Sequence, residues 1–195
     1  MIMMTLPPRR MARRAFALLV GALLPLASVL AAGSAVAAGI TISVERRGDT
    51  IAIEASALLG VDAATAWRVL TDYGRYPEFI PGLTASRVVA RNGPTVIVEQ
   101  DGYAQVWLLR APLAVTYEIT EVPPGRVRSR AVAGSLRLLD SDYRLTPLAT
   151  GVRLDYTGLA ATGTGLFGPF EQWVIEQNAT LRFRALTEAM ERAAR

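Results

Sequence analysis

The apolar residues of this chain follow one periodicity over most of its length and another at its end, and this change limits the possible folds most strongly. Between residues 40 and 157, short segments alternate apolar and polar side chains and stop at Gly, Pro or Asn, as antiparallel strands do. From about Pro169 to Arg192, apolar residues recur at helical spacing, which predicts one long amphipathic helix. The apolar positions of this helix are Ile175, Ala179, Phe183, Leu186 and Met190.

A sheet with one wet face has to bury its other face, and this helix is the only long element expected that can cover it. We therefore predict the α+β class. A curved antiparallel sheet wraps around the long C-terminal helix, and short helices follow the first strand. A sheet that curls around a single helix leaves an apolar space between the two, so a binding cavity is an immediate possibility.

Turn signals divide the chain into its expected elements. Asn92-Gly93 and Pro123-Pro124-Gly125 mark two turns, and Gly102 interrupts the longest strand as a bulge or bend does. The expected order is a hairpin over 40–53, a helix capped by Asp62, a turn or two of helix within 72–82, and strands at 83–91, 95–109, 113–122, 126–139, 141–146 and 152–157.

Residues 1–37 have the three parts of an export signal. Four Arg precede residue 15, an apolar segment follows over 15–30, and Ala35-Val36-Ala37 supplies a small-residue cleavage site. We predict cleavage after Ala37 and a periplasmic or secreted protein with one domain at 38–195. The alternative is an uncleaved N-terminal membrane anchor over residues 15–32.

The basic charge of the chain belongs to this leader. Four of the 21 basic residues precede residue 15, whereas all 17 acidic residues follow it, so the expected mature domain is formally neutral. A neutral domain gives no support for nucleic-acid binding. Arg126, Arg128, Arg130 and Arg137 could form a basic strip, but we expect them on a solvated outer face between Asp and Glu of neighbouring strands.

Missing residue types limit the chemistry that the chain can perform. It contains no His and no Cys, and every one of its 21 basic residues is Arg. This excludes Ser-His and Cys-His nucleophile pairs, Lys Schiff bases and zinc sites built from His and Cys. We expect no catalytic residue, no metal and no cofactor. An enzyme would have to use Tyr, Arg or carboxylate chemistry. Arg144 with Tyr143 or Tyr156 is a conceivable catalytic pair, but adjacent residues such as Tyr143 and Arg144 point to opposite faces of a strand.

Large and small side chains are expected to face one another inside the sheet. Such pairs either interdigitate in a packed core or leave room for an apolar guest, which Tyr hydroxyls and Gln105 would then fix in place. The large candidates are Tyr103, Gln105, Trp107, Tyr117, Tyr143 and Tyr156, and the small ones are Ser129, Ala131, Ala133 and Gly158.

The segment 72–82 and the final helix supply the other candidate ligand contacts. Tyr76, Phe79 and Ile80 lie where Pro and Gly prevent a long helix, so they either border the cavity entrance or plug one end of the core. Trp173 is a candidate ligand contact near the start of the final helix. If it or Trp107 were exposed on an apolar patch, a transient membrane or protein contact would be favoured instead.

Two motifs are interpreted as structural. Gly163-Thr164-Gly165-Leu166-Phe167-Gly168 matches G-x-G-x-x-G, but the second parallel strand of a dinucleotide site is missing, so we expect a flexible loop. Asn178-Ala179-Thr180 matches a glycosylation acceptor but lies within the predicted helix, and we place it on the helix surface.

One stretch of the sequence resembles a known superfamily. Residues 61–73 (VDAATAWRVLTDY) and 76–82 (YPEFIPG) are similar to the opening of START-like helix-grip (SRPBCC) domains, more narrowly to the polyketide cyclase/dehydrase and coenzyme Q-binding branch. The similarity continues through Val98-Glu99-Gln100, 131–134 and the terminal helix. It implies a helix-grip fold with an apolar pocket, in a superfamily whose members bind lipids, quinones, polyketides and plant hormones and have no universal catalytic residues.

The resemblance and the composition together favour a monomeric carrier or sensor. Its partner would be a hydrophobic small molecule, an isoprenoid quinone, a lipid or a polyketide-like ring, held between sheet and helix. The alternative is a polyketide cyclase or dehydratase. A third alternative is an interaction module for a membrane or a protein.

Overall fold

The computed structural model describes residues 39–106, 109–162 and 170–195, except for the side chains of 105, 106 and 109. The described strands form one antiparallel sheet in the order β1-β2-β8-β7-β6-β5-β4-β3. The strands are β1 (Thr41–Arg47), β2 (Thr50–Leu59), β3 (Leu83–Asn92), β4 (Thr95–Val106), β5 (Leu109–Val122), β6 (Arg126–Gly134), β7 (Leu138–Leu148) and β8 (Gly151–Ala161). The helices are α1 (Ala63–Thr71), the 3-10 helix η1 (Tyr73–Glu78) and α2 (Glu171–Ala193).

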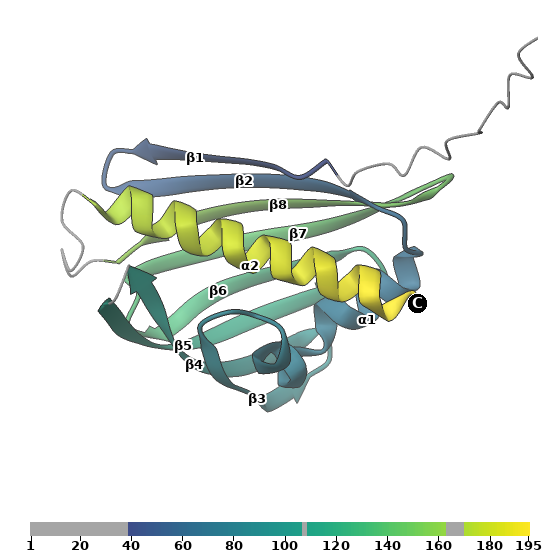
Figure 1. Ribbon diagram of the computed structural model, residues 1–195. Coiled ribbons are helices and arrows are strands. Elements are labelled where there is room, and N and C mark those ends of the chain that lie inside the picture. The colour runs from purple at the N-terminus through teal and green to yellow at the C-terminus, as the bar shows by residue number, and fades with distance from the viewer. Residues whose placement is uncertain (1–38, 107–108, 163–169) are drawn as a thin grey trace, which may run out of the picture. The chain divides into compact units, whose positions relative to one another are not determined.

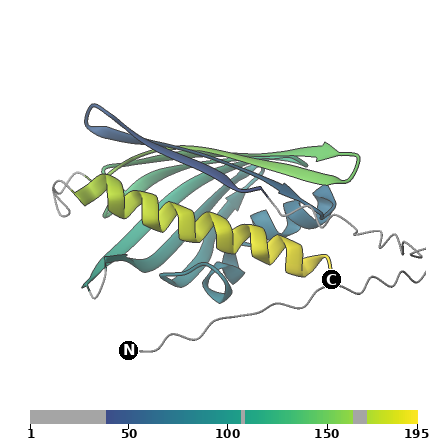
Figure 2. The same cartoon turned by 45° about the horizontal axis from the view of Figure 1, so that its top comes forward.

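The helix α2 crosses one face of the sheet, and the strands curve around it (Figures 1 and 2). This arrangement confirms the predicted α+β architecture of a sheet wrapped around a C-terminal helix. The predicted bounds of α2 were also close, because its apolar stripe carries the buried residues Phe183, Leu186 and Met190. Among the described residues, no helix is both long and apolar enough to cross a bilayer.

The short helices begin where the sequence predicts. The Oδ1 of Asp62 accepts a hydrogen bond of 2.8 Å from the backbone N–H of Thr65, and this cap starts α1. After Thr71 the chain makes only the 3-10 helix η1, which contains Pro77. The helix α1 lies beside the C-terminal end of α2, whereas η1 packs against β3 (Figure 1).

The predicted strand over 95–109 is wrong at its end. It consists of β4 up to Val106 and the start of β5 at Leu109, and these two residues are paired across the hairpin. The predicted break between residues 109 and 113 is also absent, and Pro112 lies inside β5. Pro112 is tolerated there because β6 pairs with β5 only from Val115 onward. The N–H that proline lacks is therefore not needed for a hydrogen bond to β6.

The predicted strand over 126–139 is also wrong, since a turn divides it into β6 and β7. Gly134 has a φ of 114°, and a Cβ there would collide with the carbonyl oxygen of Ala114. The next residue, Ser135, donates its backbone N–H to the same oxygen over 2.8 Å. The alternation of apolar residues continues through this turn, which is why the sequence alone suggested one strand.

The outer face of the sheet is covered by ion pairs between neighbouring strands, as predicted. Arg126 and Arg128 of β6 both form ion pairs with the carboxylate of Asp142 on β7. Arg130 of β6 pairs with Glu118 of β5 at 2.8 Å. Arg137 lies between β6 and β7 and pairs at 2.9 Å with Asp49, which lies between β1 and β2. All four arginines are therefore paired surface residues, but Arg137 is not on a strand.

Candidate functional site

A cavity of about 230 Å³ lies between the inner face of the sheet and α2. Its wall is mostly apolar and comes from every layer of the domain. Every strand except β3 contributes aliphatic residues, and α2 contributes one face between Val174 and Leu186. Apolar wall residues include Ile42, Ile53, Leu70, Ala104, Leu113, Ile119, Val127, Leu139, Ala160, Val174, Ile175, Ala179 and Leu186.

Half of the predicted site residues lie in this wall. They come from η1, from the turn that follows it and from four different strands, so only the tertiary fold brings them together. Those that line the cavity are Tyr76, Ile80, Tyr117, Ser129, Tyr143 and Tyr156. The rings of Tyr143 and Tyr156 face each other across β7 and β8 with centroids 4.6 Å apart.

Four other predicted residues lie away from the wall. Phe79 packs edge-on against Tyr76 with ring centroids 5.5 Å apart, and Ala131 packs against the core. Trp173 is 39% exposed on α2. Tyr103 is half-buried beneath Arg110, whose guanidinium carbon lies 4.6 Å from the ring centroid.

The position of Tyr103 follows from where the bulge lies. In the ladder between β3 and β4, Leu83 pairs with Gly102 but Ala85 pairs with Asp101, so the extra residue is on β3. The strand β4 therefore keeps a strict alternation, and Ala104 lines the cavity instead of its neighbour Tyr103. The side chain of Gln105, as well as Trp107 and the G-x-G-x-x-G segment 163–168, lie outside the described residues.

The tyrosines of the wall are neutral hydroxyl donors. Burial raises the pKa of Tyr117, Tyr143 and Tyr156, and the nearby cation of Arg182 only partly opposes this effect. Burial also raises the pKa of Tyr73 and Tyr76. None of these five phenols can therefore supply a phenolate base near neutral pH.

Two of these hydroxyls have fixed protein partners. Tyr76 donates to the backbone oxygen of Leu70 over 2.6 Å, and Tyr73 donates to Oε1 of Glu121 over 3.1 Å. The hydroxyls of Tyr117 and Tyr143, in contrast, donate no hydrogen bond to another described residue. The second pair is therefore free to bind a guest.

Small residues of the sheet create part of the space. The hydroxyls of Ser129 on β6 and Ser141 on β7 are 2.6 Å apart in the cavity wall. A Cβ on Gly158 would lie 2.5 Å from the hydroxyl oxygen of Tyr156, so this glycine gives the phenol its room. The predicted pairing of small with large residues thus holds for Gly158, and for Ala131, which pairs with Tyr117 across β6 and β5. Ser129 instead pairs with Ile119 and Ser141. Ala133, in contrast, is exposed.

Two polar residues of α2 line the cavity and were not predicted. Asn178 is half-buried, and its amide donates to the backbone oxygen of Val174 over 2.8 Å, so its placement on the helix surface was wrong. Arg182 follows one turn later. The sequence spacing could have predicted this position of Arg182. It lies seven residues after Ile175 and four before Leu186, and therefore on the apolar side of the helix.

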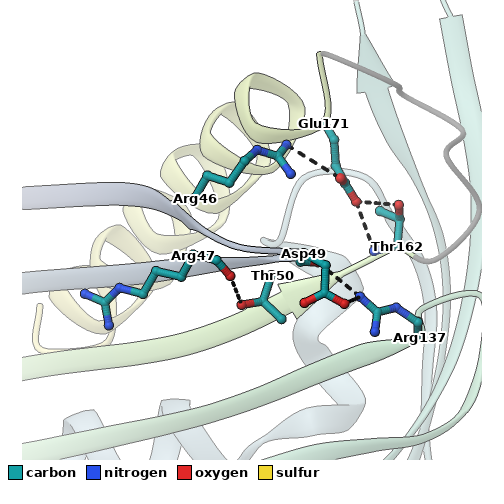
Figure 3. Close-up of polar contacts among 7 residues, drawn as sticks. All are labelled: Arg46, Arg47, Asp49, Thr50, Arg137, Thr162 and Glu171. Carbon is teal, nitrogen blue, oxygen red and sulfur yellow. Dashed lines mark hydrogen bonds and ion pairs between the residues drawn. The ribbon is translucent and has the colours of Figure 1, made fainter.

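A polar cluster around Glu171 includes Thr162 and Arg46 (Figure 3). Thr162 also lines the cavity. Oε1 of Glu171, in the first turn of α2, accepts hydrogen bonds from the backbone N–H and the hydroxyl of Thr162 over 3.1 and 2.5 Å. Arg46 of β1 lies 3.7 Å from the other carboxylate oxygen. The hydrogen bonds from Thr162 hold the pKa of Glu171 below its ordinary value, although burial opposes this. Glu171 thus joins the start of α2 to the ends of β1 and β8.

The described residues contain no cluster of three or more Asp or Glu side chains that could hold a metal ion. The wall of the cavity also contains no Asp or Glu among these residues. Its polar groups are hydroxyls, the amides of Gln100 and Asn178, and the guanidinium of Arg182. Such a wall can bind an apolar molecule and fix its polar end by hydrogen bonds.

Several solved structures share this fold. The STAR-related lipid transfer protein from Xanthomonas axonopodis (fragment 25-204) aligns with 78% of this chain and 93% of its own, with a TM-score of 0.65 and 17% identity. The Zhui aromatase/cyclase from Streptomyces aligns with 75% of this chain and 96% of its own, with a TM-score of 0.64 and 17% identity. A START superfamily protein from Mycobacterium smegmatis gives a TM-score of 0.55 at 16% identity, covering 75% of this chain and 97% of its own.

No protein of curated function matches the sequence. The sequence model of one family does match, over residues 50–195, and this family is described as polyketide cyclase/dehydrase and lipid transport. The match includes every strand except β1, both α-helices and the cavity wall apart from Ile42. The chain therefore belongs to the polyketide cyclase/dehydrase and lipid transport family, and its sheet wrapped around a C-terminal helix is the helix-grip fold of the START-like superfamily.

Proposed function

We propose that this protein binds one hydrophobic small molecule in its cavity and carries or senses that molecule without converting it. The observation that carries the proposal is the composition of the cavity wall, which is apolar and contains no carboxylate among the described residues. Removal of apolar surface from water contributes about 25 cal/mol per Å², so a few hundred Å² of contact supports binding after the costs of association.

The volume indicates the size of the guest. A cavity of about 150 Å³ lined by aliphatic and aromatic residues is enough for benzene, and this one is about 230 Å³. It suits a compact ring system or one end of a longer chain. Isoprenoid quinones, lipids and polyketide-like rings all present such a part, and we propose the ligand from these classes.

A cyclase or dehydratase is the alternative that family membership leaves open. Such an enzyme needs a group that gives or takes a proton beside the reacting carbon. The tyrosines of the wall have raised pKa values, and Arg144 is exposed on the strand face opposite Tyr143. The gaps at 107–108 and 163–169 contain no Asp, Glu, Tyr or Arg. These observations favour a carrier.

Native mass spectrometry tests the two functions directly. The protein is purified from its own host, its bound molecules are extracted, and it is then incubated with a panel of quinones, fatty acids and polyketide-like aromatic compounds. We expect one-to-one complexes and unchanged ligand masses. A reproducible mass change in a bound compound would establish the enzyme instead.

A cavity-filling variant shows whether binding occurs at this place. Ala179→Leu adds three carbons to the cavity wall on a helical position that accepts Leu well. The matched control is Ala193→Leu, which makes the same change on an exposed position of α2. We expect the first variant to lose ligand and the second to retain it. Equal binding by both would place the ligand elsewhere.

We also propose that the protein is exported, monomeric, and in contact with membranes only transiently. The three-part pattern of residues 1–37 supports export. Exposed Phe170 and Trp173 near the start of α2 support a brief membrane contact. N-terminal sequencing of the mature protein should begin within two residues of Ala38, and light scattering should give the mass of one chain. Recovery of intact Met1 in a membrane pellet would favour an anchor.

A further inference from the structure

One cation lies in the apolar cavity wall without a partner that explains it. Arg182 is half-buried on α2, its side chain lines the cavity, and its Nε is buried without a hydrogen-bond partner. Among the described residues, no carboxylate lies within ion-pair distance of its guanidinium. Most other arginines of the domain are paired, for example Arg130 with Glu118 and Arg137 with Asp49.

The cavity wall holds no negative charge that could balance Arg182. Its other polar groups are amides and hydroxyls, and no Asp or Glu belongs to the wall among the described residues. The segments 107–108 and 163–169 contain no acidic residue in their sequence. Among the described residues, the cavity wall therefore carries one positive charge and no negative charge.

The buried Nε–H of Arg182 is costly, because neither water nor another described residue accepts a hydrogen bond from it. A leucine at the same helical position would fill space and bury apolar surface. Position 182 thus works against stability in the empty protein, and this is explained if a bound molecule supplies the missing acceptor. The planar guanidinium fits two oxygens of a carboxylate or of a similar oxyanion better than any other side chain does.

Neighbouring groups extend this donor site. Tyr117 and Tyr143 line the same cavity with neutral hydroxyls that donate to no other described residue, and both lie close enough to feel the charge of Arg182. Neutral phenols beside a cation add hydrogen-bond donors for an oxyanion without adding charge. An amine or another cation would be repelled from this position.

We propose, on the basis of the proposed binding function, that the ligand is an amphipathic acid whose anionic oxygen group pairs with Arg182 while its apolar body fills the cavity. Arg182 is then a specificity residue, and the ligand class narrows to hydrophobic molecules that end in a carboxylate, a sulfonate or a phosphate. Neutral molecules of the same shape bind through the apolar wall alone.

Two fluorescent probes with the same rings distinguish binding that uses Arg182 from binding through the apolar wall alone. 8-Anilinonaphthalene-1-sulfonate carries an anionic oxygen group, and N-phenyl-1-naphthylamine is its skeleton without that group. Both are titrated into the wild-type protein and into Arg182→Leu, Arg182→Lys and Arg184→Leu. The last variant is the matched control, since Arg184 is exposed two residues along the same helix.

We expect Arg182→Leu to weaken binding of the sulfonate probe at least about tenfold, the loss of one charge-assisted hydrogen bond. Binding of the neutral probe should be unchanged or stronger. Arg182→Lys should restore part of the sulfonate affinity, and Arg184→Leu should behave as wild type. Competition by decanoate and decyl phosphate, compared with decan-1-ol, then distinguishes a carboxylate from a phosphate ligand.

The two proposals fail in different ways. If the wild-type protein binds neither probe, the cavity takes no apolar guest and the proposed function is wrong. If it binds both but Arg182→Leu weakens them equally or not at all, only the assignment of an acidic ligand is wrong. Arg182→Leu should also raise the melting temperature of the empty protein, whereas a structural role for Arg182 would lower it.

Discussion

The two ends of α2 meet the rest of the domain in different ways. The packed end, residues 187–193, lies against α1 and β2, where Met190 and Leu70 are fully buried and Val61 is 2% exposed. The cavity end, residues 171–182, faces the middle of the sheet across an open space of about 230 Å³. One continuous helix thus completes a packed core at one end and covers a cavity at the other.

Side-chain size and polarity explain the difference. At the packed end, long aliphatic side chains fill the volume between the helix and the sheet. At the cavity end, the short side chains of Ala179, Ser129 and Ser141 line the open space, and Asn178 and Arg182 bring polar atoms into the same wall. Stability therefore comes mainly from the packed end, and the ability to bind comes from the cavity end. The comparison gives three predictions.

The largest effect is expected from truncating the same helix at each end. Met190→Ala removes a fully buried side chain and should lower the free energy of unfolding by about 2–5 kcal/mol. Ile175→Ala should cost less than about 2 kcal/mol, because this half-buried side chain already borders empty space. Urea denaturation of both variants measures the difference. Equal losses would show that the cavity end is packed in solution.

A smaller effect separates two tyrosine hydroxyls of the wall. Tyr76→Phe removes the hydrogen bond to the backbone oxygen of Leu70 and should cost about 1 kcal/mol of stability. Tyr143→Phe should leave stability nearly unchanged, because its hydroxyl donates to no other described residue, but it should weaken binding of the sulfonate probe. Thermal denaturation and fluorescence titration of both variants make the comparison. A stability loss in Tyr143→Phe would contradict this assignment.

The smallest effect concerns pH at the cavity end. Hydrogen bonds from Thr162 lower the pKa of Glu171 in the folded state, so its carboxylate stabilises the fold above its unfolded pKa, and this contribution is lost as pH falls through the folded pKa. Glu171→Gln should therefore cost less than about 1 kcal/mol at neutral pH, and this cost should disappear as the pH falls through the folded pKa of Glu171. Urea denaturation of both proteins from neutral to acidic pH tests this. A difference from wild type that persists in acid would show that the carboxylate acts by packing alone.

Local patterns in the sequence determined the class of fold and most element boundaries. The cap at Asp62 and the 3.6-residue period of α2 depend on neighbours within a few residues, and both were predictable for that reason. The absence of His, Cys and Lys likewise restricted the possible chemistry, because a side chain that the sequence lacks cannot be supplied by folding. The outer-face arginines were assigned correctly because alternation in a strand is also local.

Only the tertiary structure decided where the site lies. Whether the extra residue of the bulge falls on β3 or β4 decides if Tyr103 or Ala104 faces the cavity, and this choice depends on the backbone contact between Gly82 and Gly102 across the sheet. The turn at Gly134 is set by Ala114, a residue twenty positions earlier in the chain. The role of Arg182 depends on what faces it. Helical spacing places it on the inner side of α2, but only the packing of helix on sheet shows that no carboxylate of the described residues meets it there.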